Sequence, residues 1–415
     1  MKTIIYATLV ALALPATASA SSGVITGHVM FYQNQGNYCD VATQNCAGAR
    51  YLSTERGTYQ PVRNTVLALI DDPSGVPIGF GVSDSNGSFT MSWFAASASP
   101  KAKLVWTGRH KDGRFFFLGP AGGTYQFKSK QISLVANTSP TSPQSVGSRK
   151  WGNANNPLRL FNAYDGAERL WRTTLSRSNA MLATFFDVEI RAFSDTQPSN
   201  CKTSCADGSN KLIQLSTDAP FAPQARVMHE MGHIASYLAN PRAIGNDYCW
   251  PDTGGVCGWS PGTPEWQAAA FEEALATYFA DTALWSASSE APRSCLSNGA
   301  CIGVGAMLEL SQGPIGGGSC LPNEDRFPRS SERYLWDIFD NHPDPGMNDD
   351  ISRPVYEVVD TIGSYPFGFF DHQSMESALN LDGNSAFDFM WNYWTETNVQ
   401  INTFNLLNGN CSPLF

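Results

Sequence analysis

The sequence has few charged residues and no long apolar run after its first twenty residues. Asp, Glu, Lys and Arg make up 15% of the 415 residues, well below the roughly 25% of an average soluble chain. That composition excludes a coiled coil and a charged disordered chain. The formal net charge of −10 excludes a basic nucleic-acid binder, because such a surface repels a phosphate backbone. A membrane span needs about 20 apolar residues, so we expect neither a membrane span nor a nucleic-acid partner.

The N-terminus has the pattern of a secretory signal peptide. Lys2 gives a positive start, residues 4–14 are almost wholly apolar, and Ala18-Ser19-Ala20 fits a small-residue cleavage site. We therefore expect residues 1–20 to be a signal peptide, and the mature chain to begin near Ser21 and to be secreted or periplasmic. A retained N-terminal anchor is the alternative.

Ten cysteines follow the signal segment, and none forms a Cys-x-x-Cys pair. An even number in an exported chain predicts disulfide bonds, and the lack of a Cys-x-x-Cys pair argues against a zinc–thiolate site. Eight of the cysteines form four pairs of close neighbours in sequence: Cys39 and Cys46, Cys201 and Cys205, Cys249 and Cys257, and Cys295 and Cys301. The remaining two are Cys320 and Cys411. Spacing alone leaves the connectivity open.

Residues 21–137 have the pattern of short strands separated by turns. Residues 66–70 are all apolar, as in a strand covered on both faces, whereas residues 89–93 alternate, as in a half-exposed strand. The turn-forming residues 84–87 lie between them. This pattern predicts an N-terminal β-sandwich. The stretch Ser-Asp-Ser-Asn-Gly-Ser-Phe at residues 83–89 resembles the transthyretin-like (carboxypeptidase regulatory-like) modules that often accompany exported peptidases.

Residues 138–150 are rich in Ser, Thr and Pro without apolar periodicity, which predicts a linker. After this segment helices and strands are mixed, which predicts an α+β domain over residues 151–415 and hence a multi-domain protein. The predicted elements are a helix opening at Asn156-Pro157, strands at 186–192 and 211–216, and helices at 222–238 and about 263–284.

The sequence His-Glu-Met-Gly-His at residues 229–233 lies within the helix predicted at 222–238. Positions i and i+4 share one helix face about 5–6 Å apart, so the imidazoles of His229 and His233 can bind one metal ion. Glu230 then lies at the edge of the same site, where it can act as a base without being a ligand. Metzincins carry Gly three and His six residues after the second His. Here those positions hold Ser236 and Ala239, which excludes that class.

Zinc requires a third protein donor, and the segment at residues 271–278 resembles the gluzincin metallopeptidases at this point. Their third ligand is a Glu on a following helix, followed by a small residue and, three residues on, by Ala or Ser. Glu273, forty residues after His233, fits this pattern with Ala274 and Ala276, whereas Glu272 is the alternative. Small residues also let the two helices pack closely enough for the carboxylate to approach within about 2 Å of zinc.

The resemblance implies a zincin-like domain and a zinc-dependent endopeptidase that hydrolyses protein or peptide substrates with metal-activated water and Glu230 as the general base. Thermolysin-type relatives carry an Asp four residues after the Glu ligand that orients a histidine. Thr277 stands there, so the orienting partner is unassigned. The oxyanion donor is also open, with four candidates: Tyr278, Tyr334, His342 and His372. The strand at 211–216 is expected to pair with an extended peptide along its edge.

Three further alternatives concern metals and function. Residues 340–350 are rich in oxygen ligands, but their spacing fits no EF-hand, so a Ca²⁺ site is unsupported and a polar turn is favoured. The same His–Glu constellation would also suit a structural zinc site in an exported binding or adhesion protein. Hydrolysis of a bond other than a peptide bond is a third alternative.

Overall fold

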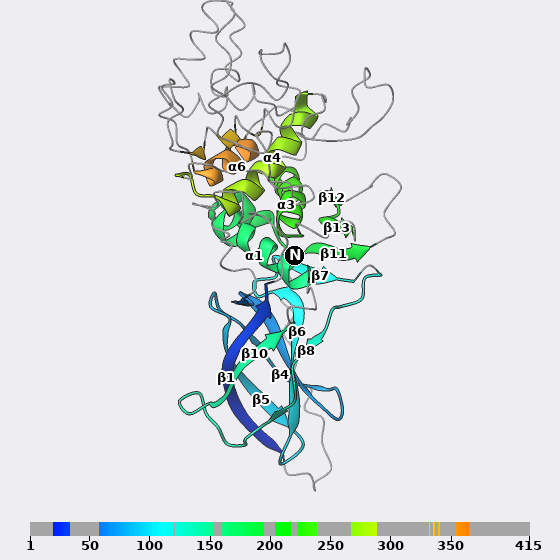
Figure 1. Cartoon of the computed structure of the whole chain (residues 1–415), viewed down its shortest axis with the longest axis vertical. Helices are drawn as coiled ribbons and strands as arrows, with labels where there is room; N and C mark the ends of the chain where they lie inside the picture. The colour runs from blue at the N-terminus through cyan, green and yellow to red at the C-terminus, as the bar shows by residue number, and fades with distance from the viewer. Residues whose placement is uncertain are drawn as a thin grey trace, which may run out of the picture.

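The computed structural model places two β-sheets beside a group of helices (Figure 1). It describes residues 20–33, 58–119, 121–152, 159–194, 204–216, 223–239, 267–288 and 354–364, and the single positions 332, 335, 336, 339 and 340. Within this described part the chain is rich in strands and has few helices. The N-terminal region is β-rich, as the sequence predicts.

The smaller sheet is centred on β1 (Ser21–Tyr32). β1 pairs in parallel with β10 (Gln144–Trp151) and antiparallel with β2 (Tyr59–Pro61) and β5 (Ser88–Ala95). β5 alternates buried and exposed side chains, which confirms the half-exposed strand predicted at 89–93. β10 contradicts the linker predicted at 138–150, because residues 144–150 belong to this strand. Strand pairing uses backbone groups alone, so a Ser- and Thr-rich segment can form a strand when an open strand edge lies beside it.

The larger sheet crosses the sequence boundary between the two predicted domains. Its order is β12 (Cys205–Asp207), β13 (Leu212–Ser216), β11 (Val188–Ser194), β7 (Phe115–Leu118), β6 (Lys101–His110), β3 (Thr65–Asp71) and β4 (Pro77–Val82), and β8 (Phe127–Lys128) and β9 (Ile132–Ser133) also pair with β6. β7 pairs in parallel with β11, so the N-terminal strands and the later α+β region share one sheet. β3 is buried along most of its length, as predicted for residues 66–70.

Two strands of this sheet begin one or two residues later than the sequence pattern predicts. β11 begins at Val188 and β13 at Leu212. The residue before each strand, Asp187 or Lys211, has a φ of 54° or 51°. Such left-handed backbone cannot continue an extended strand, and residue type alone does not reveal it.

The helices are α1 (Arg159–Thr173), the 3₁₀ turn η2 (Leu175–Arg177), α2 (Asn179–Thr184), α3 (Pro223–Ala239), α4 (Gln267–Leu284) and α6 (Val355–Ser364). α3 and α4 confirm the helices predicted at 222–238 and 263–284 within the described positions. The helix start predicted at Asn156 lies outside the described residues. Among the described residues, no helix is both long and apolar enough to cross a membrane.

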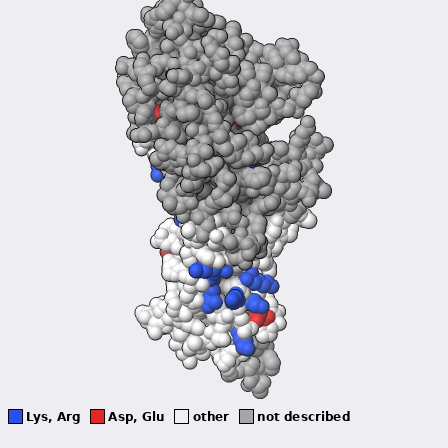
Figure 2. Space-filling model, in the orientation of Figure 1, with Lys and Arg blue, Asp and Glu red and all other residues white. Residues whose placement is uncertain are grey.

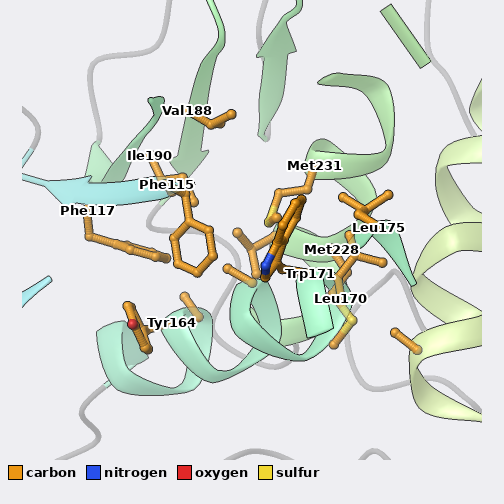
Figure 3. Close-up of a cluster of buried hydrophobic side chains, with 14 of the residues drawn as sticks. Phe115, Phe117, Tyr164, Leu170, Trp171, Leu175, Val188, Ile190, Met228 and Met231 are labelled. Carbon is orange, nitrogen blue, oxygen red and sulfur yellow. The ribbon is translucent and has the colours of Figure 1, made fainter. Parts of the chain in front are cut away.

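One hydrophobic core joins the larger sheet to the helices (Figure 3). Phe115 and Phe117 of β7 point toward α1, where Phe115 packs 5.5 Å from the ring of Tyr164. Met228 and Met231 of α3 enter the same cluster. One face of α3 is therefore fixed by the core, and its opposite face is left for the two histidines.

Helix α1 also connects the N-terminal strands to α3 through buried polar groups. Asp165 accepts hydrogen bonds from Arg63 at 2.9 Å and from Gln224, on α3, at 3.0 Å. One turn later, Glu168 accepts a hydrogen bond from Asn64 at 2.7 Å. Because a buried polar group must be satisfied, these pairs fix how α1 lies against both neighbours.

Cys205 takes part in a disulfide bond, as the even number of cysteines predicts. The other nine cysteines lie outside the described residues, and so do residues 1–19 of the predicted signal peptide.

Candidate metal centre

The two histidines predicted as metal ligands lie together on α3. Their Nε2 atoms are 3.1 Å apart, and the rings meet edge to face with centroids 4.6 Å apart. The side chain of His229 is buried and that of His233 nearly so. Spacing within one helix is sufficient to bring these nitrogens together, as the sequence predicts.

Helix α4 contributes the third donor. Oε2 of Glu273 lies 3.3 Å from Nε2 of His229 and 3.5 Å from Nε2 of His233. A tetrahedral zinc ion with bonds of about 2.0–2.1 Å holds its donor atoms about 3.3 Å apart. The triangle formed by the three donor atoms matches that separation on every side. His229, His233 and Glu273 therefore form a group that could hold a metal ion.

The Glu273 carboxylate and the two imidazoles shift one another's pKa values. Burial alone raises the pKa of Glu273, but the imidazoles of His233 and His229 outweigh burial and hold that pKa well below its usual range. Burial likewise lowers the pKa of His233, whereas the Glu273 and Glu272 carboxylates raise it well above the usual value. Glu273 is thus an anion at neutral pH, which is the form that a metal ion binds.

A glycine brings the two helices close enough for this contact. A Cβ atom on Gly232 would lie 2.7 Å from Cα and 2.8 Å from the carbonyl oxygen of Ala276. The expected role of Ala276 as a small packing residue on α4 is confirmed, and sequence reasoning missed its partner Gly232. The available signal was a glycine inside a helix, which costs about 1 kcal/mol relative to alanine unless close packing requires it.

Thr277 is the orienting partner that the sequence left unassigned. Its hydroxyl donates a hydrogen bond to the carbonyl oxygen of Glu273 at 2.9 Å, and lies 3.2 Å from Nδ1 of His229. Because the hydroxyl proton is already used, its oxygen accepts from an Nδ1–H group. That tautomer places the lone pair of Nε2 of His229 on the side of Glu273, as a metal ligand requires.

Glu272 lies at the other ring nitrogen of the second histidine. Its Oε1 is 3.6 Å from Nδ1 of His233, while Glu273 is near Nε2. This placement favours Glu273 as the third donor over the alternative Glu272. At 3.6 Å this contact is electrostatic and not a hydrogen bond, so the two adjacent glutamates lie at different nitrogens of the same imidazole.

Glu230, the predicted base, is buried next to His229, with 3% of its surface exposed. Burial raises its pKa above the ordinary value, and the nearby His229, His233 and Arg226 lower it by less. A carboxyl group with a raised pKa holds a proton more readily near neutral pH, which suits general-base chemistry.

Of the four candidate oxyanion donors, Tyr278 alone lies among the described residues. Tyr278 is fully buried, and its ring packs edge-on against Phe339 at 6.2 Å. It follows Glu273 by five positions, which turns it about 140° around α4. This rotation away from Glu273 argues against Tyr278 as the oxyanion donor. Tyr334, His342 and His372 lie outside the described residues, as do residues 341–350 of the segment considered for Ca²⁺.

The expected peptide-binding edge is also corrected. β12 pairs antiparallel with β13, with Cys205 opposite Gln214 and Asp207 opposite Leu212. The edge of β13 is therefore already used along those residues, and β12 is the outer strand within the described part. Sequence reasoning missed β12 because it is only three residues long.

No protein-family model and no curated protein matches this chain. Among solved structures, it is similar to a 9R-lipoxygenase from Cyanothece PCC8801. The similarity covers 37% of this chain and 23% of that one, at 14% sequence identity and a TM-score of 0.17. Similarity of this extent carries no argument about fold or activity.

Proposed function

We propose that this chain is an exported zinc-dependent endopeptidase of the gluzincin type, with a zincin-like region built around α3 and α4. The observation that carries the proposal is the triangle of three donor atoms with sides of 3.1, 3.3 and 3.5 Å. The buried Glu230 directly follows the first of the three residues. Zinc held by His229, His233 and Glu273 would supply a Lewis acid that polarises a carbonyl group and lowers the pKa of water.

Other residues of the chain would transfer the proton and orient the metal ligands. Glu230 accepts a proton from the attacking water and passes it to the leaving amine. Thr277 and Glu272 hold the two imidazoles in position. Structural zinc sites use four protein ligands, whereas catalytic ones use three. The described residues bring three together, which is the number that a catalytic site uses.

The test compares zinc content and casein hydrolysis in the mature wild-type chain and in Glu230→Gln. We expect Glu230→Gln to keep about one zinc per chain and to lose hydrolysis by about 10²–10⁴-fold, because only the base is removed. Glu189→Gln is the matched control. Glu189 forms an ion pair with Arg191 on β11, so this variant should keep wild-type activity.

Chelation and reconstitution provide the second half of the test. Removal of zinc should abolish hydrolysis and added zinc should restore it. Full activity in Glu230→Gln would show that the assigned base is wrong. A wild-type chain that holds zinc tightly but cleaves no peptide bond would support the structural zinc site instead, and cleavage of an ester but not of casein would change the substrate class.

A further inference from the structure

The outward side of the strands β4, β3, β6 and β8, which we call the outer face, combines apolar and cationic side chains. Ala68 pairs with Phe80 on one side and with Val105 on the other, and Val105 pairs with Lys128. Directly paired residues of neighbouring strands point to the same face of a sheet. Since Leu67 and Leu69 beside Ala68 point into the core, this row of four residues points away from it.

The apolar part of the outer face consists of a buried cluster with exposed side chains beside it. Ala68, Ile70 and Val105 form a small buried cluster separate from the main core. Beside them Phe80 is 62% exposed and Val82 is 48% exposed. The solvated face of an antiparallel sheet is normally polar. Exposed apolar side chains next to an apolar floor therefore indicate a surface that contacts a partner.

The cationic part lies on the same side. Lys101 and Lys103 alternate along β6 with core residues and so share the face of Val105, while Lys128 pairs with Val105 itself. Asp72 forms an ion pair with Lys103, which partly offsets the charge. Figure 2 shows Lys and Arg side chains gathered on the strand-rich part of the molecule with little acidic surface among them.

This region differs in charge from the rest of the chain. Residues 21–152 contain 12 Lys and Arg against 6 Asp and Glu, a balance of +6, although the whole chain carries −10. The excess of positive charge is therefore a local property of the strand-rich region. A surface of this kind attracts anions even though the protein as a whole is acidic.

We propose that the outer face docks the protein on an anionic lipid bilayer. Lysines attract the phosphate headgroups, at about 1 kcal/mol each, and their hydrocarbon stems lie along apolar surface while the ammonium groups stay at the interface. Phe80 and Val82 carry no polar atom on their side chains, so they fit the acyl boundary and offer nothing to a sugar hydroxyl. A soluble polyanion would bind the lysines but would make no contact that requires these two apolar side chains.

The test measures binding of the full mature chain to sedimented vesicles. Vesicles of equal amounts of phosphatidylcholine and phosphatidylglycerol should bind the chain, vesicles of phosphatidylcholine alone should bind it weakly, and added NaCl should weaken binding. Lys128→Gln should lower the affinity about fivefold, from about 1 kcal/mol per lysine. Phe80→Ser should lower it about tenfold, because an apolar side chain no longer leaves water.

Two matched controls separate this face from general effects. Lys111→Gln removes the same charge in the turn after β6, at the opposite end of that strand from Lys101. Leu182→Ser removes an apolar side chain that is 41% exposed on α2. Both should bind vesicles like the wild type. Since Phe80 and Lys128 are exposed, their variants should keep the wild-type melting temperature.

Three results would overturn the proposal. The first is an absence of binding to the anionic vesicles. The second is binding by Phe80→Ser and Lys128→Gln that equals binding by the two controls. The third is tight binding to a soluble polyanion such as dextran sulfate without binding to vesicles, which would assign the lysines to a polymer.

Discussion

Replacement of Thr277 tests the geometry of the metal centre without altering any metal donor. Thr277→Val keeps the shape of the side chain but removes the oxygen that accepts from Nδ1 of the buried His229 at 3.2 Å. Taking the acceptor away from a buried donor costs about 1–3 kcal/mol. Loss of an orienting partner of a metal ligand lowers metal affinity about 10–100-fold, which corresponds to about 1.4–2.7 kcal/mol. The two estimates agree, so we expect a loss of zinc affinity within that range.

The measurement is the zinc dissociation constant, obtained by competition with a chromophoric chelator. Thr277→Ser keeps the hydroxyl and should retain affinity within about threefold, since the partner of the imidazole is still present. Thr282→Val is the matched control on the same helix. Thr282 also donates to a backbone carbonyl, that of Phe279 at 3.1 Å, so its loss should leave zinc affinity unchanged.

Either of two results would contradict this role of Thr277. Thr277→Val could bind zinc as tightly as the wild type, in which case the hydroxyl does not orient His229. Alternatively, Thr277→Ser could lose as much affinity as Thr277→Val, in which case packing by the methyl group matters and not the hydrogen bond.

Two further predictions concern helix packing and pH. Gly232→Ala should destabilise the fold by about 1–3 kcal/mol and weaken zinc binding, because its Cβ would overlap Ala276; a gain of stability in urea unfolding, as helix propensity alone predicts, would contradict it. Burial lowers the pKa of His110 in the folded chain to about 4. As the pH falls, the imidazole is therefore protonated in the unfolded chain before it is protonated in the folded chain. The free energy of unfolding should fall by about 3 kcal/mol as the pH drops from 6.5 to 4. His110→Phe should lose correspondingly less stability over that range in urea unfolding, and an unchanged pH slope would contradict the assignment.

The sequence predicted the elements whose residues carry a strong local pattern. Helices α3 and α4 and the alternation of β5 follow from periodicity within a single segment, and each appears in the structure close to its predicted bounds. Prediction failed where the secondary structure of a segment depends on a distant partner or on a backbone angle. Residues 144–150 form a strand because β1 offers them an edge, and Asp187 delays β11 through a backbone angle that residue type does not reveal.

The sequence by itself determined the pair of histidines, because residues four apart on one helix meet whatever surrounds the helix. It also determined that a carboxylate and small residues follow on a second helix. Only the tertiary structure decided that Glu273 reaches the two Nε2 atoms while Glu272 faces Nδ1 of His233, and that Thr277 orients His229. The physical reason is that these contacts depend on how closely, and at what rotation, α4 packs on α3. That arrangement is set by the contact of Gly232 with Ala276, two residues far apart in the chain.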